Sequence, residues 1–156
     1  IFRDAEARAG DGTRGDVFLF ADTFNRHFEP ENLRAAVRVL AAAGYRVRPA
    51  EGQGRPLCCG RTYLAAGMVP EARREAKRLL DALEGSDAPV VGLEPSCLMT
   101  LRDELPALLP GESAERLAKR ALLLTELLER DKSMPELKPV APVAHVHGHC
   151  HQKSFG

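Results

Sequence analysis

Two adjacent cysteines, Cys58 and Cys59, followed by Gly60, are the residues of this sequence best suited to metal or redox chemistry. Thiolate sulfur binds zinc and iron–sulfur clusters. A disulfide between neighbouring cysteines needs a strained geometry, so the pair is not expected to bridge. Cys97 and Cys150 complete a set of four. We therefore expect a reducing compartment and thiols kept for a metal or redox site, with buried structural thiols as the alternative.

Two carboxylates flank the cysteine pair at similar distances along the chain. Asp22 precedes Cys58 by 35 intervening residues. On the other side, 34 residues separate Cys59 from Glu94, which opens the segment EPSC that ends at Cys97. Carboxylate oxygen can complete a mixed sulfur and oxygen site, or it can only accept hydrogen bonds. Both roles are open for Asp22 and Glu94.

Histidines alternate near the end of the sequence, at His145, His147, His149 and His151. On an extended chain such a row points to one face, where it could bind metal or move protons. We favour a simpler interpretation in which the first two pack within a strand and only His149 and His151 join Cys150 as metal-ligating candidates. A Cys–His hydrolase is a weaker idea, because neighbours on a strand point to opposite faces.

Strands alternating with helices are predicted to position these residues. The predicted strands are 17–21, 45–47 and 89–93, and residues 143–147 lead into a last strand. The predicted helices begin at Pro30 and at Pro70, and the strongest helical pattern covers residues 113–130. The basic residues of the helix after Pro70 are expected to form a solvated flank: Arg73, Arg74, Lys77 and Arg78. This order predicts an α/β domain with a mostly parallel sheet flanked by helices.

The candidate residues all follow predicted strands. Asp22 follows the first, the cysteine pair follows the second, Glu94 and Cys97 follow the third, and Cys150 follows the last. In parallel α/β sheets the ligand crevice lies beyond the carboxyl ends of the strands. We therefore expect one shared site at that edge.

Composition limits the class of function. The 156 residues are 44% hydrophobic and 28% charged, which is typical of a globular domain. Lys plus Arg and Asp plus Glu both number 22, so the balance argues against a nucleic-acid surface. No apolar run is long enough to span a bilayer, and no nucleotide-binding glycine motif follows a strand. We expect a cytoplasmic location and leave peripheral association with the inner membrane face open.

The motif CCG at residues 58–60, with EPSC at 94–97, resembles the cysteine-rich (CCG) domain found in heterodisulfide reductase and in the iron–sulfur component of glycolate oxidase. The segments FADTFNRHFEPEN, CCGRTYLAAGM, GLEPSCLMTLRDE and HGHCHQK are similar to the branch at the C-terminus of FAD-linked oxidases of the D-lactate dehydrogenase kind. In that branch the family's first cysteine is replaced by Asp, here Asp22, and the first cysteine of the Cys-Pro-x-Cys segment by Glu, here Glu94.

The resemblance implies an iron–sulfur cluster of 4Fe–4S type held by Cys58, Cys59 and Cys97, with Asp22 and Glu94 as auxiliary ligands or hydrogen-bond partners. It implies an electron-transfer domain of a flavin-linked oxidoreductase that acts on a small 2-hydroxy acid such as D-lactate or glycolate. FAD would bind an upstream domain that is absent here, next to a ferredoxin-like domain. Electrons would pass to a quinone or protein acceptor. The domain alone is not expected to be catalytic.

The resemblance also divides the chain. Residues 1–16 are expected to be a linker from an upstream region, and residues 17–134 a first CCG unit. Residues 135–156 are expected to be a connector and the truncated start of a second unit, with Cys150 at its first-cysteine position. Because two liganding cysteines are replaced by carboxylates, zinc or a cluster-free structural or interaction domain is the alternative.

Overall fold

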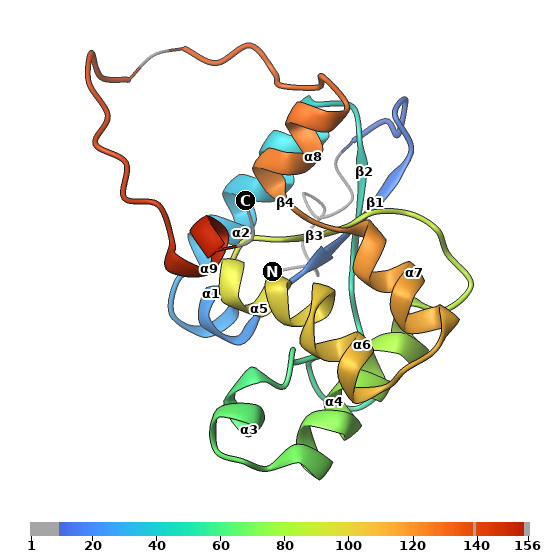
Figure 1. Ribbon diagram of the computed structural model, residues 1–156. Helices are drawn as coiled ribbons and strands as arrows, with labels where there is room; N and C mark the ends of the chain where they lie inside the picture. The colour runs from blue at the N-terminus through green and yellow to red at the C-terminus, as the bar shows by residue number, and fades with distance from the viewer. Residues whose placement is uncertain (1–9, 139, 155–156) are drawn as a thin grey trace.

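A computed structural model describes residues 10–138 and 140–154, so most of the predicted linker, residues 1–9, lies outside the described residues. The sheet contains the parallel strands β1 (Asp16–Phe20), β2 (Arg46–Pro49), β3 (Val90–Gly92) and β4 (Ala121–Leu123). Their order across the sheet is β2-β1-β3-β4. Val17 pairs with Val47 and Leu19 with Val91, which fixes the register of the central strands. The predicted α/β class and parallel sheet are confirmed (Figure 1).

Helices connect the strands and cover both faces of the sheet. Their bounds are α1 (Thr23–His27), α2 (Pro30–Ala42), α3 (Arg61–Ala65), α4 (Val69–Leu83), α5 (Pro95–Arg102), α6 (Glu104–Leu108), α7 (Glu112–Arg120), α8 (Leu124–Arg130) and α9 (Cys150–Ser154). Prolines stand at the first turns of α2, α4 and α5, where their fixed φ suits a helix start. The helices predicted from Pro30 and Pro70 are therefore confirmed.

The alternation of side chains along the strands creates two hydrophobic cores. On one face, Phe20 and Val90 pack with apolar residues of α4, α5, α6 and α7. On the other face, Leu19 and Val91 pack with apolar residues of α2 and α8. Figure 1 shows these two helix groups on opposite sides of the strands. A parallel sheet covered in this way is buried on both faces, and this leaves its carboxyl edge as the place for a site.

The long helix predicted over residues 113–130 is wrong in its middle, where the structure forms β4. Ala121–Leu123 is extended and pairs in parallel with β3. Arg102 of α5 donates to the carbonyl of Ala121 (2.8 Å), and Glu126 accepts from the backbone N–H of Leu123 (2.7 Å). The leucine spacing fits a helix, but tertiary hydrogen bonds stabilise the strand instead. A strand of three residues is too short to show a period of its own.

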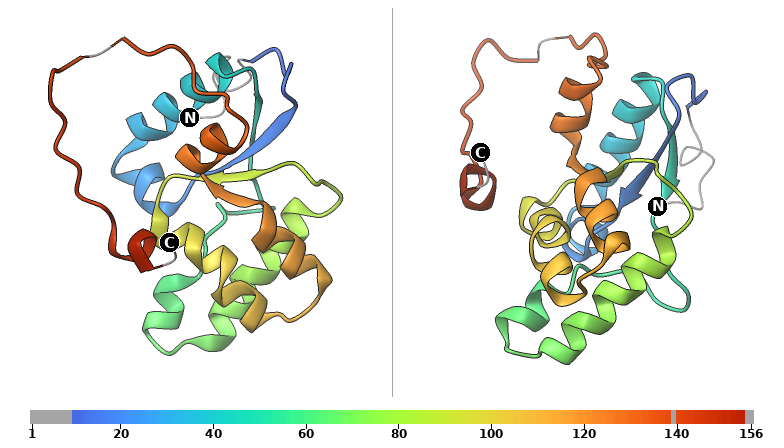
Figure 2. Two further views of the ribbon diagram at one scale, coloured as in Figure 1. Left: turned by 45° about the horizontal axis from the view of Figure 1, so that its top comes forward. Right: turned by 45° about the vertical axis from the view of Figure 1, so that its right-hand side comes forward.

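The strand predicted around residues 143–147 is also wrong. This segment has no regular structure, and its apolar side chains Val143 and Val146 are exposed. Figure 2 shows the chain after Ser133, over residues 134–138 and 140–149, running away from the domain and returning to it at α9. His145 and His147 are exposed rather than packed under helices. The alternating pattern here has no neighbouring strand to pair with among the described residues, so it does not produce a strand.

Among the described residues no helix combines the length and the apolar character that crossing a bilayer requires.

Candidate cysteine site

Cys59 and Cys97 meet at the carboxyl edge of the sheet. Their Sγ atoms are 3.2 Å apart, and the two side chains are 5% and 6% exposed. Cys59 comes from the loop after β2, whereas Cys97 lies in the first turn of α5 after β3. The parallel topology brings together these sulfurs, which are 38 residues apart in the sequence. Both face the core that α4–α7 form against the sheet.

Gly60 shapes the turn that presents the cysteine pair. It caps α3 with a φ of +83°, a left-handed conformation that glycine adopts without a steric penalty. A Cβ here would also lie 3.4 Å from Ala72 and from the Glu75 side chain of α4. The backbone N–H of Gly60 faces the Sγ of Cys58 at 3.5 Å, and Cys58 is only partly buried. The glycine of the motif therefore lets the turn lie close to α4 with one sulfur near solvent.

Both thiols of the pair hold their protons at neutral pH. The hydrogen bond to Cys59, followed by burial, raises the pKa of Cys58 well above its ordinary value. For Cys59 the contact with Cys58 lowers the pKa, but the contact with Cys97 and burial outweigh it and raise the pKa to about 12. A metal must displace these protons, so metal binding at this site should strengthen as pH rises.

Asp22 is buried at the end of β1 and acts as the N-cap of α1. One carboxylate oxygen accepts from the backbone N–H groups of Phe24 and Asn25, each at 3.0 Å. The other accepts from the side-chain amide of Asn25 at 2.7 Å. The amide of Asn25 in turn accepts a bond from Asn32 (3.1 Å). These bonds engage both oxygens of Asp22 in the local fold.

Glu94 plays the same part at the start of α5. Its Oε1 accepts from the backbone N–H of Ser96 (3.2 Å) and from the Ser96 hydroxyl (2.6 Å). The sequence left two roles open for Asp22 and Glu94, metal binding and hydrogen bonding. In the structure both carboxylates accept hydrogen bonds from the helix that follows them.

The C-terminal histidines reach the rim of this site through α9, which packs on α5. His149 Nε2 lies 3.6 Å from Glu94 Oε1, and His151 Nε2 lies 3.2 Å from a guanidinium nitrogen of Arg61. Cys150 is exposed on α9, and no hydrogen bond in the described range joins its sulfur to the other three. The structure thus brings His149 and His151 to the rim, one of them beside Glu94, but it leaves Cys150 outside the sulfur group.

The cysteine sulfurs at this edge are suitable ligands for a metal or a cluster, but two of them lie too close together to share one metal ion. Over residues 10–138 and 140–154, no three Cys, His, Asp or Glu side chains are arranged to hold one metal ion. Two sulfurs on one tetrahedral zinc, each at about 2.3 Å, would lie about 3.8 Å apart, so Cys59 and Cys97 must separate before they share a metal. Three soft donors at one sheet edge, Cys58, Cys59 and Cys97, remain the set that could hold a cluster or zinc.

Three residues of the site were missed by sequence reasoning. Glu75, Arg55 and Arg78 form an ion-pair group beneath the cysteine loop, with the carboxylate of Glu75 buried at its centre. Arg78 is therefore not part of a solvated flank. One signal was available: Glu75 occupies a core-facing position of α4, between Ala72 and Leu79, where an apolar residue is expected.

Two arginines next to the CCG and EPSC motifs form ion pairs with acids outside these motifs. Arg61 binds Glu104 at 2.6 Å, and Arg102 binds Glu126. Neither reaches Asp22 or Glu94 by a hydrogen bond within the described part of the chain. The charges of these arginines are therefore balanced locally.

Mild oxidation of the metal-free protein should join Cys59 to Cys97. Their sulfurs are 3.2 Å apart, and small side-chain rotations suffice to reach a disulfide of about 2.05 Å. With diamide, an azo oxidant, the two thiol hydrogens pass to the nitrogen atoms as the S–S bond forms. Peptide mass spectrometry without reduction should find this link as the main product. A main link from Cys58 to Cys97 would contradict the geometry.

Comparison with known proteins gives one family and two relatives. The model of the CCG family, described as a cysteine-rich domain, matches residues 21–102. The chain is 30% identical over 86% of its length to "Lactate utilization protein A" of Bacillus velezensis, of which it covers 57%. It is 34% identical over 72% of its length to "Uncharacterized protein YkgE" of Escherichia coli, of which it covers 46%. The chain thus spans about half the length of these relatives. No solved structure matches it significantly.

Proposed function

Because the chain belongs to the cysteine-rich CCG domain family, we propose that it is an electron-transfer domain that holds an iron–sulfur cluster in an oxidoreductase acting on a small 2-hydroxy acid. The observation that carries this proposal is the meeting of Cys59 and Cys97, with Cys58 adjacent, at the carboxyl edge of the sheet. Thiolates are the usual ligands of such clusters. The name of the Bacillus relative mentions lactate utilization, and we propose D-lactate, or the similar acid glycolate, as the substrate.

In this proposal Cys58, Cys59 and Cys97 would hold the cluster, and Asp22 and Glu94 are not ligands. A cluster of this kind takes up and releases single electrons. The chain contributes a dry environment, since Cys59 and Cys97 are buried, and one partly exposed ligand, Cys58, on the side from which a partner can approach. Asp22 and Glu94 hold the starts of α1 and α5 by capping them. The cap at Glu94 fixes the first turn of α5, which carries Cys97.

The wider setting belongs to the same proposal. An upstream flavin domain that carries FAD would oxidise the substrate, a ferredoxin-like domain would pass electrons to this one, and a quinone or protein acceptor would receive them. A cytoplasmic location, with or without contact to the inner membrane face, is consistent with this role.

A structural alternative is favoured by a specific observation. The described residues contain no three-ligand metal arrangement, and the thiols of Cys58 and Cys59 have raised pKa values. A domain that has lost its cluster would show the same features, whereas a zinc scaffold would require these thiols to converge and lose their protons. Its role would be docking within the same kind of oxidoreductase.

Anaerobic reconstitution of this chain with iron and sulfide decides between the two. We expect visible thiolate-to-iron absorption, several iron and sulfide per chain, and an EPR signal in one of the two redox states. The parallel control is the same protein reconstituted with zinc alone. Stoichiometric zinc that iron and sulfide do not displace, with no visible absorption, would contradict the electron-transfer proposal and support the scaffold.

A further inference from the structure

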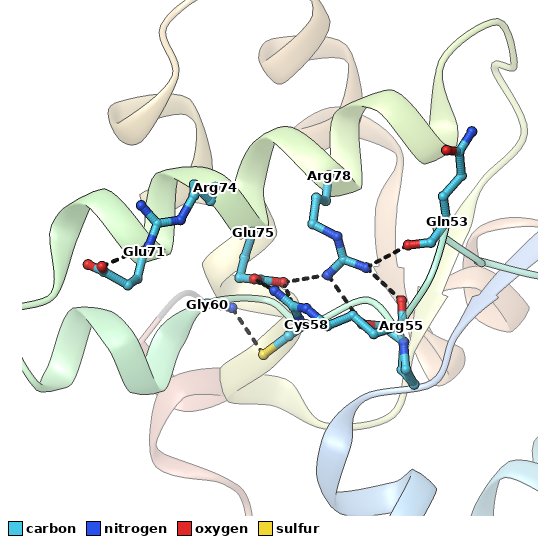
Figure 3. Close-up of polar contacts among 9 residues, drawn as sticks. Gln53, Arg55, Cys58, Gly60, Glu71, Arg74, Glu75 and Arg78 are labelled. Atoms are coloured by element: carbon cyan, nitrogen blue, oxygen red, sulfur yellow. Dashed lines mark hydrogen bonds and ion pairs between the residues drawn. The ribbon is translucent and has the colours of Figure 1, made fainter.

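The loop that carries the cysteine pair has no regular structure of its own. It runs from Ala50 to Gly60, between β2 and α3. Leu57 is buried in the core beneath it, but most of the stretch before Leu57 is exposed. Backbone carbonyls in such a stretch need partners from outside the loop. The side chains that supply them come from α4 (Figure 3).

Arg78 of α4 supplies several of these bonds at once. Its guanidinium donates to the carbonyls of Arg55 (2.6 Å), Pro56 (3.3 Å) and Gln53 (3.4 Å). A guanidinium has five N–H donors in a rigid plane, so a single side chain can bind several carbonyls together. Figure 3 shows this fan of bonds from Arg78 to the loop. The loop is thereby attached to α4 two residues before Cys58.

Glu75, one turn before Arg78, completes the attachment. Its side chain is 2% exposed, and its carboxylate lies between two guanidinium groups. Oε2 accepts from Arg78 at 2.8 Å and from Arg55 at 3.1 Å, and Oε1 also accepts from Arg55. Burial alone would raise the pKa of Glu75, but the bonds from Arg55 and Arg78 hold it below its ordinary value. The carboxylate is therefore ionised, and it ties the loop through Arg55 as well as through Arg78.

The attachment is close to the cysteines. A Cβ at Gly60 would meet the Glu75 side chain at 3.4 Å, so the loop turns directly above this residue. Arg55, whose pKa the bond from its guanidinium to Glu75 raises, lies three residues before Cys58 on this loop. One carboxylate between two guanidinium groups leaves a net positive charge beside the sulfurs. A positive charge favours thiolates and the reduced form of an anionic centre.

We propose that Glu75 is a positioning residue for the cysteine site: by holding Arg55 and Arg78 together it fixes residues 53–60 on α4 and sets where Cys58 and Cys59 lie. This inference rests on the proposed function only for its electron-transfer consequence, because the positioning itself concerns the metal-free chain. Glu71 and Arg74 form a similar pair on the same helix, at 2.8 Å, but this pair is more exposed and makes no hydrogen bond to the loop within the described range. It supplies the matched control.

The test compares Glu75→Gln with Glu71→Gln in the metal-free protein. The amide introduced by Glu75→Gln would turn an N–H donor toward a guanidinium, so the loop should open more often. We expect iodoacetamide to alkylate Cys59 about tenfold faster in Glu75→Gln, as followed by peptide mass spectrometry, because the buried thiol reacts only when the loop opens. Cys97 stays on α5 but loses its contact with the Cys59 sulfur when the loop opens, so its rate should rise less than that of Cys59. Every cysteine in Glu71→Gln should keep its wild-type rate. A general loss of structure would accelerate Cys59 and Cys97 equally.

A second variant covers the case in which Glu75→Gln unfolds. Arg55 is 57% exposed, so Arg55→Gln removes one arm and leaves Glu75 paired with Arg78. Arg55→Gln should also speed the alkylation of Cys59, but by a smaller factor than Glu75→Gln. Two results would overturn the inference. One is alkylation of Cys59 at the wild-type rate in both Arg55→Gln and Glu75→Gln. The other is an equal increase in the alkylation rates of Cys59 and Cys97.

Reconstituted protein then separates the two proposals. If wild type forms a cluster, Glu75→Gln should shift its midpoint potential and Glu71→Gln should not. If wild type forms none, the proposed function fails, whereas selective alkylation of Cys59 would still support positioning by Glu75.

Discussion

Replacing Cys59 with serine should weaken the affinity of the reconstituted protein for iron by at least about tenfold, because even residues that only support metal ligands cost about 10–100-fold in affinity when they are changed. Cys59 is the central member of the sulfur group, since it contacts Cys97 and is bonded to Cys58 in the chain. A serine hydroxyl is a poor substitute for a thiolate on iron. Iron and sulfide per chain, with the visible spectrum, measure the effect.

The variant must be shown to remain folded, because a hydroxyl in this buried place has a cost of its own. An unsatisfied polar group costs about 1–3 kcal/mol, which lowers the midpoint of unfolding without removing the fold. Cys150→Ser is the comparison, since Cys150 is exposed on α9, outside the sulfur group. It should bind iron as wild type does. A folded Cys59→Ser that binds iron normally, or an equal loss in Cys150→Ser, would remove the case for a centre built on Cys59 and Cys97.

The convergence of the sulfurs could be predicted because it depends on topology alone. The strands around Val17, Val47 and Val91 are short β-favouring runs between strong helix patterns, and such an order gives a parallel sheet. Segments that follow the parallel strands of one sheet then lie at the same edge, here after β2 and β3 on either side of β1. Cys59 and Cys97 therefore meet as predicted. Their separation of 3.2 Å could not be predicted, because it depends on how each side chain packs against α4–α7.

The roles of polar side chains could not be predicted in the same way. Whether a carboxylate binds metal or caps a helix depends on where the backbone N–H groups of the next turn point, and Asp22 and Glu94 are both followed at once by a helix. In the sequence Arg78 resembles a solvated surface cation, because the sequence does not show that the carbonyls of residues 53–56 lie beside it. Neighbouring segments also decide which element a local pattern forms. The leucines of 121–123 fit a helix but pair with β3 as a strand, and the alternating segment around Val146 forms no strand because no strand lies beside it among the described residues.

Removing the carboxylate of Asp22 should destabilise the fold far more than exchanging it for an amide. In Asp22→Ala the first turn of α1 loses both capping bonds, and the buried amide of Asn25 loses its acceptor. A lost cap costs about 0.5–2 kcal/mol, and an unsatisfied buried amide about 1–3 kcal/mol, so the free energy of unfolding should fall by about 2–4 kcal/mol. Asp22→Asn keeps the capping oxygen but loses the bond from the Asn25 amide, so it should lose about 1 kcal/mol. Urea unfolding measures both.

The same pair of variants decides whether Asp22 is a metal ligand. If the carboxylate only caps α1, Asp22→Asn should bind as much iron per chain as wild type, because asparagine is as good an N-cap as aspartate. If the carboxylate binds iron, the amide is a weaker donor, and iron should fall in Asp22→Asn although this variant loses only about 1 kcal/mol of stability. Loss of iron in a folded Asp22→Asn would therefore contradict a role limited to capping. Since both oxygens of Asp22 are already engaged by α1, and a metal could take one only by breaking these bonds, we expect iron binding in Asp22→Asn to be unchanged.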